Sequence, residues 1–249
     1  GYGKLGGKEL GYASDLDIIF LYDDDAPEAR DTYARLGQRI NNWLNSMTSA
    51  GMLYETDLAL RPDGASGLLV SSVDAFRDYQ LHKAWIWEHQ ALTRARFSAG
   101  DASIGAAFET IRKAVLMQAR EQRTLKEEVV AMRQKMLDGH PNHSGLFDLK
   151  HDAGGIIDVE FIVQYLVLAH APAHAELTDN RGNVSLLGQL AKLGLVDVDL
   201  APKVADAYVE FRRLQHAMRL QGQTKTLLPK AQVSPHVIAV QTLWEQVFG

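Results

Sequence analysis

Residues 14–22 read Ser-Asp-Leu-Asp-Ile-Ile-Phe-Leu-Tyr, and this stretch decides how the first part of the chain is interpreted. Polar and apolar residues alternate and then give way to a continuous apolar run, which predicts a strand buried on both faces at its far end. Side chains at i and i+2 leave one face of a strand, so Asp15 and Asp17 should point the same way. Because adjacent carboxylates repel each other unless a cation lies between them, the stretch predicts a metal site.

A short glycine turn precedes this strand. Carboxylate oxygens suit Mg²⁺, which keeps water ligands and shares the phosphate groups of a substrate. Gly6 and Gly7 would let the backbone approach such phosphates closely, and the Ser14 hydroxyl could donate a hydrogen bond to one. We interpret these three residues as a triphosphate cradle, with a plain tight turn as the alternative for the two glycines.

A second alternating segment, residues 52–60, predicts another strand. It places Asp57 opposite four apolar side chains, as expected of a third carboxylate that faces a cleft. Residues 61–67 contain proline and glycine and are predicted to form a loop. Arg61, at the start of this loop, carries a guanidinium suited to phosphate recognition, although pairing with a local acid is the alternative. The predicted catalytic and metal-binding residues are Asp15, Asp17 and Asp57, and the predicted nucleotide-binding residues are Gly6, Gly7, Ser14 and Arg61.

The rest of the sequence reads mainly as helix. Helical periods run from about residue 33 to 47 and, after a cap at Ser72 or Asp74, to about Arg96. We expect this second helix to pack its tryptophans inward and turn its charges outward; it carries Trp85, Trp87, Glu88, His89, Arg94 and Arg96. Beyond Asp101, helices are expected at about 102–118, 122–137, 156–170, 184–194, 200–221 and 236–248, with a short extended piece at 146–150. The pattern predicts an α+β fold, with a catalytic domain at residues 1–100 and an all-helical domain at residues 101–249.

Composition excludes several classes of function. The 249 residues are 46% hydrophobic and 23% charged, as is ordinary for a soluble globular protein. A net charge of −5 argues against a nucleic-acid partner bound by a basic face. There is no cysteine, which excludes disulfides and a thiol nucleophile and fits a cytoplasmic location. No apolar run reaches about 18 residues, so no membrane association is expected.

An ordered set of motifs resembles the glutamine synthetase adenylyltransferase family, within the nucleotidyltransferase superfamily that includes DNA polymerase β. In chain order the motifs are Gly1-Tyr2-Gly3-Lys4-Leu5-Gly6-Gly7-Lys8-Glu9-Leu10, Ser14-Asp15-Leu16-Asp17, Leu60-Arg61-Pro62, Gly64-x-x-Gly67, Trp87-Glu88-His89 with Ala95-Arg96, and Gly154-Gly155-Ile156-x-Asp158-x-Glu160-Phe161. The resemblance is looser beyond about Gln164. It implies a small mixed-sheet nucleotidyltransferase domain followed by a helical bundle. A strand and a helix normally precede the point at which this sequence begins, so an N-terminally truncated fragment is expected.

The resemblance also implies an activity. In that family AMP passes from ATP to a tyrosine of glutamine synthetase, pyrophosphate is released, and nitrogen assimilation is thereby regulated. Two Mg²⁺ ions would be held by Asp15 and Asp17, with Asp57 near the nucleophile. The effectors implied are glutamine and a PII-type nitrogen-signalling protein. Three features resemble the C-terminal, AMP-attaching half of the family's enzymes: Tyr2, Ala13-Ser14-Asp15-Leu16-Asp17 and Trp85-x-Trp87-Glu88-His89.

One departure from the family pattern keeps alternatives open. The pattern Asp-x-Arg-Leu-Arg-Pro reads Asp57-Leu58-Ala59-Leu60-Arg61-Pro62 here, so Ala59 replaces a cationic side chain. The first alternative is the adenylyl-removing half, which uses phosphate as the nucleophile. The second is a non-catalytic nucleotide-binding regulatory module, for which Ala59 is the motive. A nucleic-acid-directed transferase ranks third because of the acidic net charge.

Overall fold

The computed structural model describes residues 1–12 and 14–249; Ala13, part of the motif quoted above, lies outside the described residues. The fold is α+β, and it divides into two compact units, Gly1–Gln118 and Ala119–Gly249. Across the described residues, no helix combines the length and the apolar character needed to span a bilayer.

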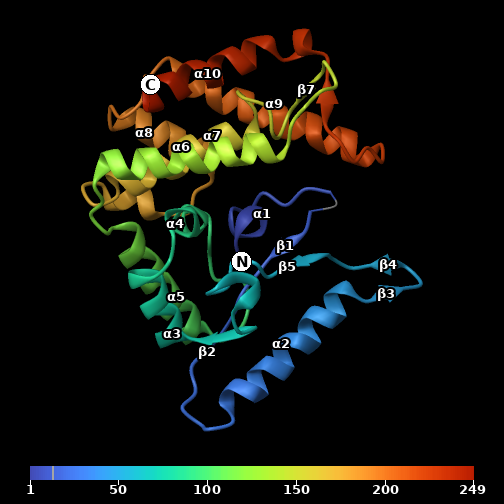
Figure 1. The fold of residues 1–249 in the computed structure, drawn as a ribbon, viewed down its shortest axis with the longest axis vertical. Coiled ribbons are helices and arrows are strands. Elements are labelled where there is room, and N and C mark those ends of the chain that lie inside the picture. Colours follow the sequence, from blue (N-terminus) through green and yellow to red (C-terminus); the bar gives the residue numbers. More distant parts are fainter. Residues whose placement is uncertain (13) are drawn as a thin grey trace. The chain divides into compact units, whose positions relative to one another are not determined.

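Unit 1 consists of short strands and helices (Figure 1). Two parallel pairs, β1–β5 and β2–β6, and one antiparallel pair, β3–β4, make up its β-structure. Its elements are α1 (Gly3–Gly6), β1 (Leu16–Asp17), β2 (Phe20–Tyr22), α2 (Ala29–Asn45), β3 (Met47–Thr48), β4 (Gly51–Met52), β5 (Thr56–Asp57), the 3₁₀ turn η1 (Gly64–Ser66), β6 (Val70–Ser72), α3 (Val73–His82), α4 (Ile86–Leu92) and α5 (Ala102–Leu116).

The strand expected near residue 15 is divided into β1 and β2, which have different partners. Leu16 lies opposite Thr56 in the β1–β5 pair, whereas β2 pairs with β6. The helix α2 covers the second pair at Gly37, where a Cβ would lie 3.3 Å from the Phe20 ring and 3.4 Å from Val70. The absence of a side chain at Gly37 therefore allows α2 to pack closely on β2 and β6.

The prediction of a single helix from about residue 72 to 96 is wrong, because the chain forms two helices there. Ser72 caps α3, its hydroxyl oxygen accepting from the backbone N–H of Ala75 at 3.2 Å. Helix α3 ends at His82, and the backbone turns extended at Trp85 before α4 begins. Glu88 then stabilises the start of α4 by accepting from the backbone N–H of Trp85 at 2.9 Å.

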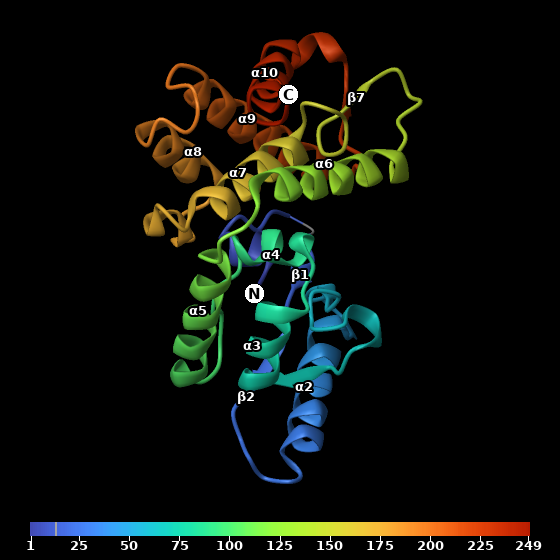
Figure 2. The same cartoon turned by 60° about the vertical axis from the view of Figure 1, so that its left-hand side comes forward.

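Helix α5 belongs to unit 1, so the two compact units divide after Gln118 and not near Gly100. It packs on α3, where the rings of Phe76 and Phe108 lie 5.7 Å apart between centroids, and on α4 (Figure 2). Both phenylalanines are buried. The end of the strands therefore does not mark the end of the unit.

Unit 2 is helical apart from one antiparallel pair of two-residue strands, so the expected all-helical domain is wrong in this respect. The first of these strands lies within the short extended piece expected at residues 146–150. Helix α7 is its centre: eleven of its residues are buried, and α6, α8, α9 and α10 all pack against it. The elements are α6 (Gln122–Gly139), β7 (Phe147–Asp148), α7 (Ile156–His170), the 3₁₀ turn η2 (Ala175–Thr178), α8 (Asn183–Lys192), α9 (Leu200–Leu220), β8 (Leu227–Leu228), the 3₁₀ turn η3 (Lys230–Gln232) and α10 (Ser234–Phe248).

Candidate functional site

The structure brings the three acidic residues singled out from the sequence together. One carboxylate oxygen from each of Asp15, Asp17 and Asp57 can be chosen so that all three lie within 4.8 Å of one another. The parallel β1–β5 pair sets this geometry, because Asp17 lies directly opposite Asp57. Backbone hydrogen bonds from Leu16 N–H to Glu55 O (2.8 Å) and from Ile18 N–H to Asp57 O (3.0 Å) fix the register. The role of the three residues as metal ligands stays a prediction.

The electrostatics of the cluster favour a cation. The pKa of Asp17 is raised to about 6, first by burial and then by the negative charges of Asp15 and Asp57. Lys4 and Arg94 oppose this shift. An all-oxygen donor set that is partly open to solvent suits a hard divalent ion that keeps water ligands, as Mg²⁺ does. The residues present therefore fit the metal that the sequence predicted.

Gly3 is a site residue that sequence reasoning missed. It has a φ of +50°, and a Cβ built there would lie 2.0 Å from Asp17 Oδ2. The adjacent residue, Tyr2, is buried, and its backbone N–H donates to the carbonyl oxygen of Asp17 at 2.8 Å. The segment thus holds Asp17 by its backbone while leaving space for its carboxylate. The available signal was the first Gly-x-Gly of the chain.

Gly6 and Gly7 pack against Arg94. A Cβ on Gly6 would lie 2.1 Å from the Arg94 carbonyl oxygen, and one on Gly7 would lie 2.9 Å from Arg94 Nε. Neither glycine has a positive φ, so close packing and not an unusual backbone conformation explains both. Arg94 itself is buried and forms an ion pair with Glu9 at 2.8 Å. Whether these glycines also contact phosphate stays a prediction.

The interpretation of the segment around α4 is corrected. Trp85 and Trp87 were expected to pack inward, but their exposed fractions are 68% and 37%. Glu88, by contrast, is buried, because it caps α4 and also accepts a hydrogen bond from Tyr79 Oη at 3.0 Å. Burial raises the pKa of Glu88. Polar side chains of this segment thus lie in the interior of unit 1 and its two tryptophans lie at the surface, which is the reverse of what was expected.

Two predicted nucleotide-binding residues hold local structure. The Ser14 hydroxyl oxygen accepts from the Gly11 backbone N–H at 3.1 Å. The Arg61 guanidinium donates to three carbonyl oxygens of its own loop, those of Leu58 (2.7 Å), Ala65 (3.1 Å) and Gly67 (3.3 Å). Arg61 therefore shapes the loop that follows Asp57. Phosphate binding by Ser14 or Arg61 stays a prediction.

Comparisons with known proteins agree with these motifs. Residues 1–111 match the family model described as glutamate-ammonia ligase adenylyltransferase, and residues 123–237 match the one described as GlnD PII-uridylyltransferase. Similar curated proteins are named bifunctional glutamine synthetase adenylyltransferase/adenylyl-removing enzyme. Those of Aromatoleum aromaticum and Nitrosomonas eutropha are 60% and 56% identical, over 100% of this chain and 26% and 28% of their own lengths. The protein of Chromobacterium violaceum is 57% identical over 100% of this chain and 27% of its own length.

These matches identify a class of enzyme: the relatives are adenylyltransferases, which are nucleotidyltransferases. Over its whole length the chain is similar to one segment of these glutamine synthetase adenylyltransferase enzymes. It spans about a quarter of the length of the curated relatives that it matches.

We expect Gly3→Ala to weaken divalent-ion binding at least tenfold, because the added methyl group would occupy the position of Asp17 Oδ2. Gly145→Ala is the matched control: it also has a positive φ, of +73°, but its Cβ would meet nothing within 4 Å. Calorimetric titration of both variants with Mn²⁺ measures the effect. Equal affinities for the two variants would contradict the positioning role of Gly3.

Asp17→Asn should stabilise the metal-free protein at pH 8 by about 1 kcal/mol, a figure discounted for the partial exposure of the site. The folded protein holds the pKa of Asp17 near 6 against an ordinary value of 3.8. The folded state thus favours the protonated form, and wild-type stability falls as pH rises through this window. Urea unfolding in EDTA at pH 8 and pH 4 checks the sign: the gain should shrink at pH 4. No gain at pH 8, with exposed Asp25→Asn as the control, would refute it.

Proposed function

We propose that this chain transfers AMP from ATP to a tyrosine of glutamine synthetase with release of pyrophosphate, and so regulates nitrogen assimilation. The observation that carries the proposal is the convergence of three carboxylates, two on the paired strands β1 and β5 and one directly before β1, with oxygens within 4.8 Å. Similarity to the adenylyltransferase family supports the reaction class. In this proposal the nucleotidyltransferase domain comprises residues 1–100, joined in its compact unit by α5, and a helical domain follows.

The proposed chemistry assigns a role to each acidic residue. Asp15 and Asp17 would hold two Mg²⁺ ions, which when bound stabilise negative charge on the attacking and leaving oxygens. Asp57 is the most exposed of the three and would accept the proton of the acceptor tyrosine. The tyrosine oxygen then forms a bond to the α-phosphorus of ATP while the bond to pyrophosphate breaks. Gly6, Gly7, Ser14 and Arg61 would orient the triphosphate.

The proposed partners follow from the family. Glutamine synthetase is the acceptor, and glutamine and a PII-type nitrogen-signalling protein are the effectors. The match of residues 123–237 to a model named for PII uridylylation supports a link between the second unit and PII. A cytoplasmic location fits a chain without cysteine.

The adenylyl-removing reaction is the second candidate, because the names of the relatives include both activities. The same carboxylates would serve it, with inorganic phosphate as the nucleophile and ADP as the product. Ala59 motivates a third reading as a regulatory nucleotide-binding module. Its backbone N–H donates to Asp57 Oδ1 at 2.7 Å, a contact that requires no cationic side chain.

Incubation with unmodified glutamine synthetase and Mg-ATP tests the proposal directly. We expect a tyrosine of the synthetase to gain the mass of AMP and pyrophosphate to accumulate, as followed by mass spectrometry and a coupled pyrophosphate assay. Asp15→Asn and Asp17→Asn should each abolish transfer with the fold retained, and Asp25→Asn should leave it unchanged. ADP released only from adenylylated synthetase and phosphate would favour the removing reaction. Nucleotide binding without either product would favour the regulatory module.

A further inference from the structure

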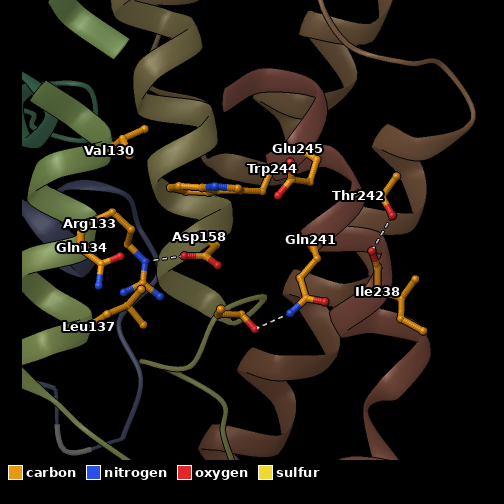
Figure 3. A pocket seen from close by; sticks show the side chains of 11 residues that line it. Val130, Arg133, Gln134, Leu137, Asp158, Ile238, Gln241, Thr242, Trp244 and Glu245 are labelled. Atoms are coloured by element: carbon orange, nitrogen blue, oxygen red, sulfur yellow. Dashed lines mark hydrogen bonds and ion pairs between the residues drawn. The ribbon is translucent and has the colours of Figure 1, made fainter. Parts of the chain in front are cut away.

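Unit 2 contains a cleft of about 510 Å³ that the function proposed above does not use. Its walls are α6 and α10, and its floor includes the loop before α7 and the first turn of α7 (Figure 3). Both wall helices pack against α7. All of its lining residues belong to one compact unit, so the cleft does not depend on the carboxylate cluster of unit 1.

A buried arginine lines this cleft. Arg133 is only 2% exposed, and its Nε donates to Asp158 Oδ1. Its Nη2 donates to the carbonyl oxygen of His151 at 2.8 Å. Its Nη1 is buried and finds no acceptor among residues 1–12 and 14–249. A buried donor without an acceptor costs free energy that a suitably placed oxygen would recover.

Neither oxygen of Asp158 accepts a hydrogen bond from Arg133 Nη1, and each already accepts one from another donor. Oδ2 accepts from the Gly154 backbone N–H at 2.5 Å while Oδ1 accepts from Arg133. The sequence motif that contains Asp158 does not reveal this pair, because Arg133 lies 25 positions earlier in the chain. The ion pair is thus held in place, and Nη1 of the guanidinium remains without an acceptor.

The opposite wall restricts what could supply that acceptor. The indole of Trp244 extends from α10 towards α6 and offers a flat apolar surface (Figure 3). Gln241 turns its amide nitrogen to the Ala153 carbonyl oxygen at 3.1 Å. The exposed acid Glu245 lines the cleft and disfavours a ligand with several negative charges. A small, largely apolar ligand with a single carboxylate or amide group meets these conditions.

We propose that the α6–α10 cleft binds a small aliphatic monocarboxylate or primary amide whose oxygen accepts a hydrogen bond from Arg133 Nη1. A carboxylate and an amide share the required sp² oxygen, and the aliphatic chain would pack on Trp244. The proposal concerns unit 2 alone, so it stands or falls separately from AMP transfer.

Saturation-transfer NMR on the full 249-residue chain tests the proposal, with butyrate and butyramide as probes and butylamine and butanol as chain-matched controls. We expect saturation of butyrate, butyramide or both, and little of the amine and the alcohol. Thr242→Trp, an exposed lining position whose hydroxyl bonds only within α10, should fill the cleft and reduce the signal at least fivefold. Gln246→Trp, exposed on α10 outside the cleft, should leave it unchanged.

A response of butyrate alone or of butyramide alone identifies which oxygen chemistry binds and supports the proposal. Equal saturation of all four probes, saturation that survives Thr242→Trp, or no saturation of either oxygen probe would overturn it. If Thr242→Trp fails to fold by circular dichroism, Ile238→Trp provides the same block from another exposed lining position, where the wild-type side chain is 61% exposed.

Discussion

Mutual repulsion among three carboxylates is the constraint on which unit 1 depends. Parallel pairing of β1 and β5 places Asp17 opposite Asp57, and backbone hydrogen bonds hold the two residues in that register. Burial, and after it the negative charges of Asp15 and Asp57, raises the pKa of Asp17 in the metal-free state. A ligand that binds only the folded state stabilises it by mass action. A divalent ion would therefore stabilise this fold as well as complete the site.

The residues packed around the carboxylate cluster fix the position of Asp17. Gly3 leaves room for the Asp17 carboxylate, and Tyr2 holds the Asp17 backbone. The turn that follows is fixed by Arg94, on which Gly6 and Gly7 pack. Glycine positions that look alike in the sequence thus have different physical roles. Gly3 leaves space for the Asp17 carboxylate, whereas Gly6 and Gly7 allow their own segment to pack closely against Arg94.

The sequence was sufficient where the deciding interaction is local. Alternation predicted strands at residues 15–22 and 52–60, and of the second range only Met52 and Thr56–Asp57 form strand. Helical periods beyond residue 101 predicted α5 to α10 to within a few residues. The sequence was insufficient where a residue distant in the chain determines whether a charged side chain is buried. Glu88 is buried because it caps α4 and receives the Tyr79 hydroxyl, which periodicity reads as a surface acid. Arg133 likewise looks like a solvated helix residue until its pairing with Asp158 is seen.

Crystallographic anomalous scattering from Mn²⁺, soaked with a non-hydrolysable ATP analogue, tests the central claim most directly. The account predicts Mn²⁺ between Asp15 and Asp17, with an oxygen of Asp57 on one of the ions and phosphate oxygens completing the coordination. Bound nucleotide with Mn²⁺ coordinated elsewhere, or with no Mn²⁺ at these three carboxylates, would contradict it.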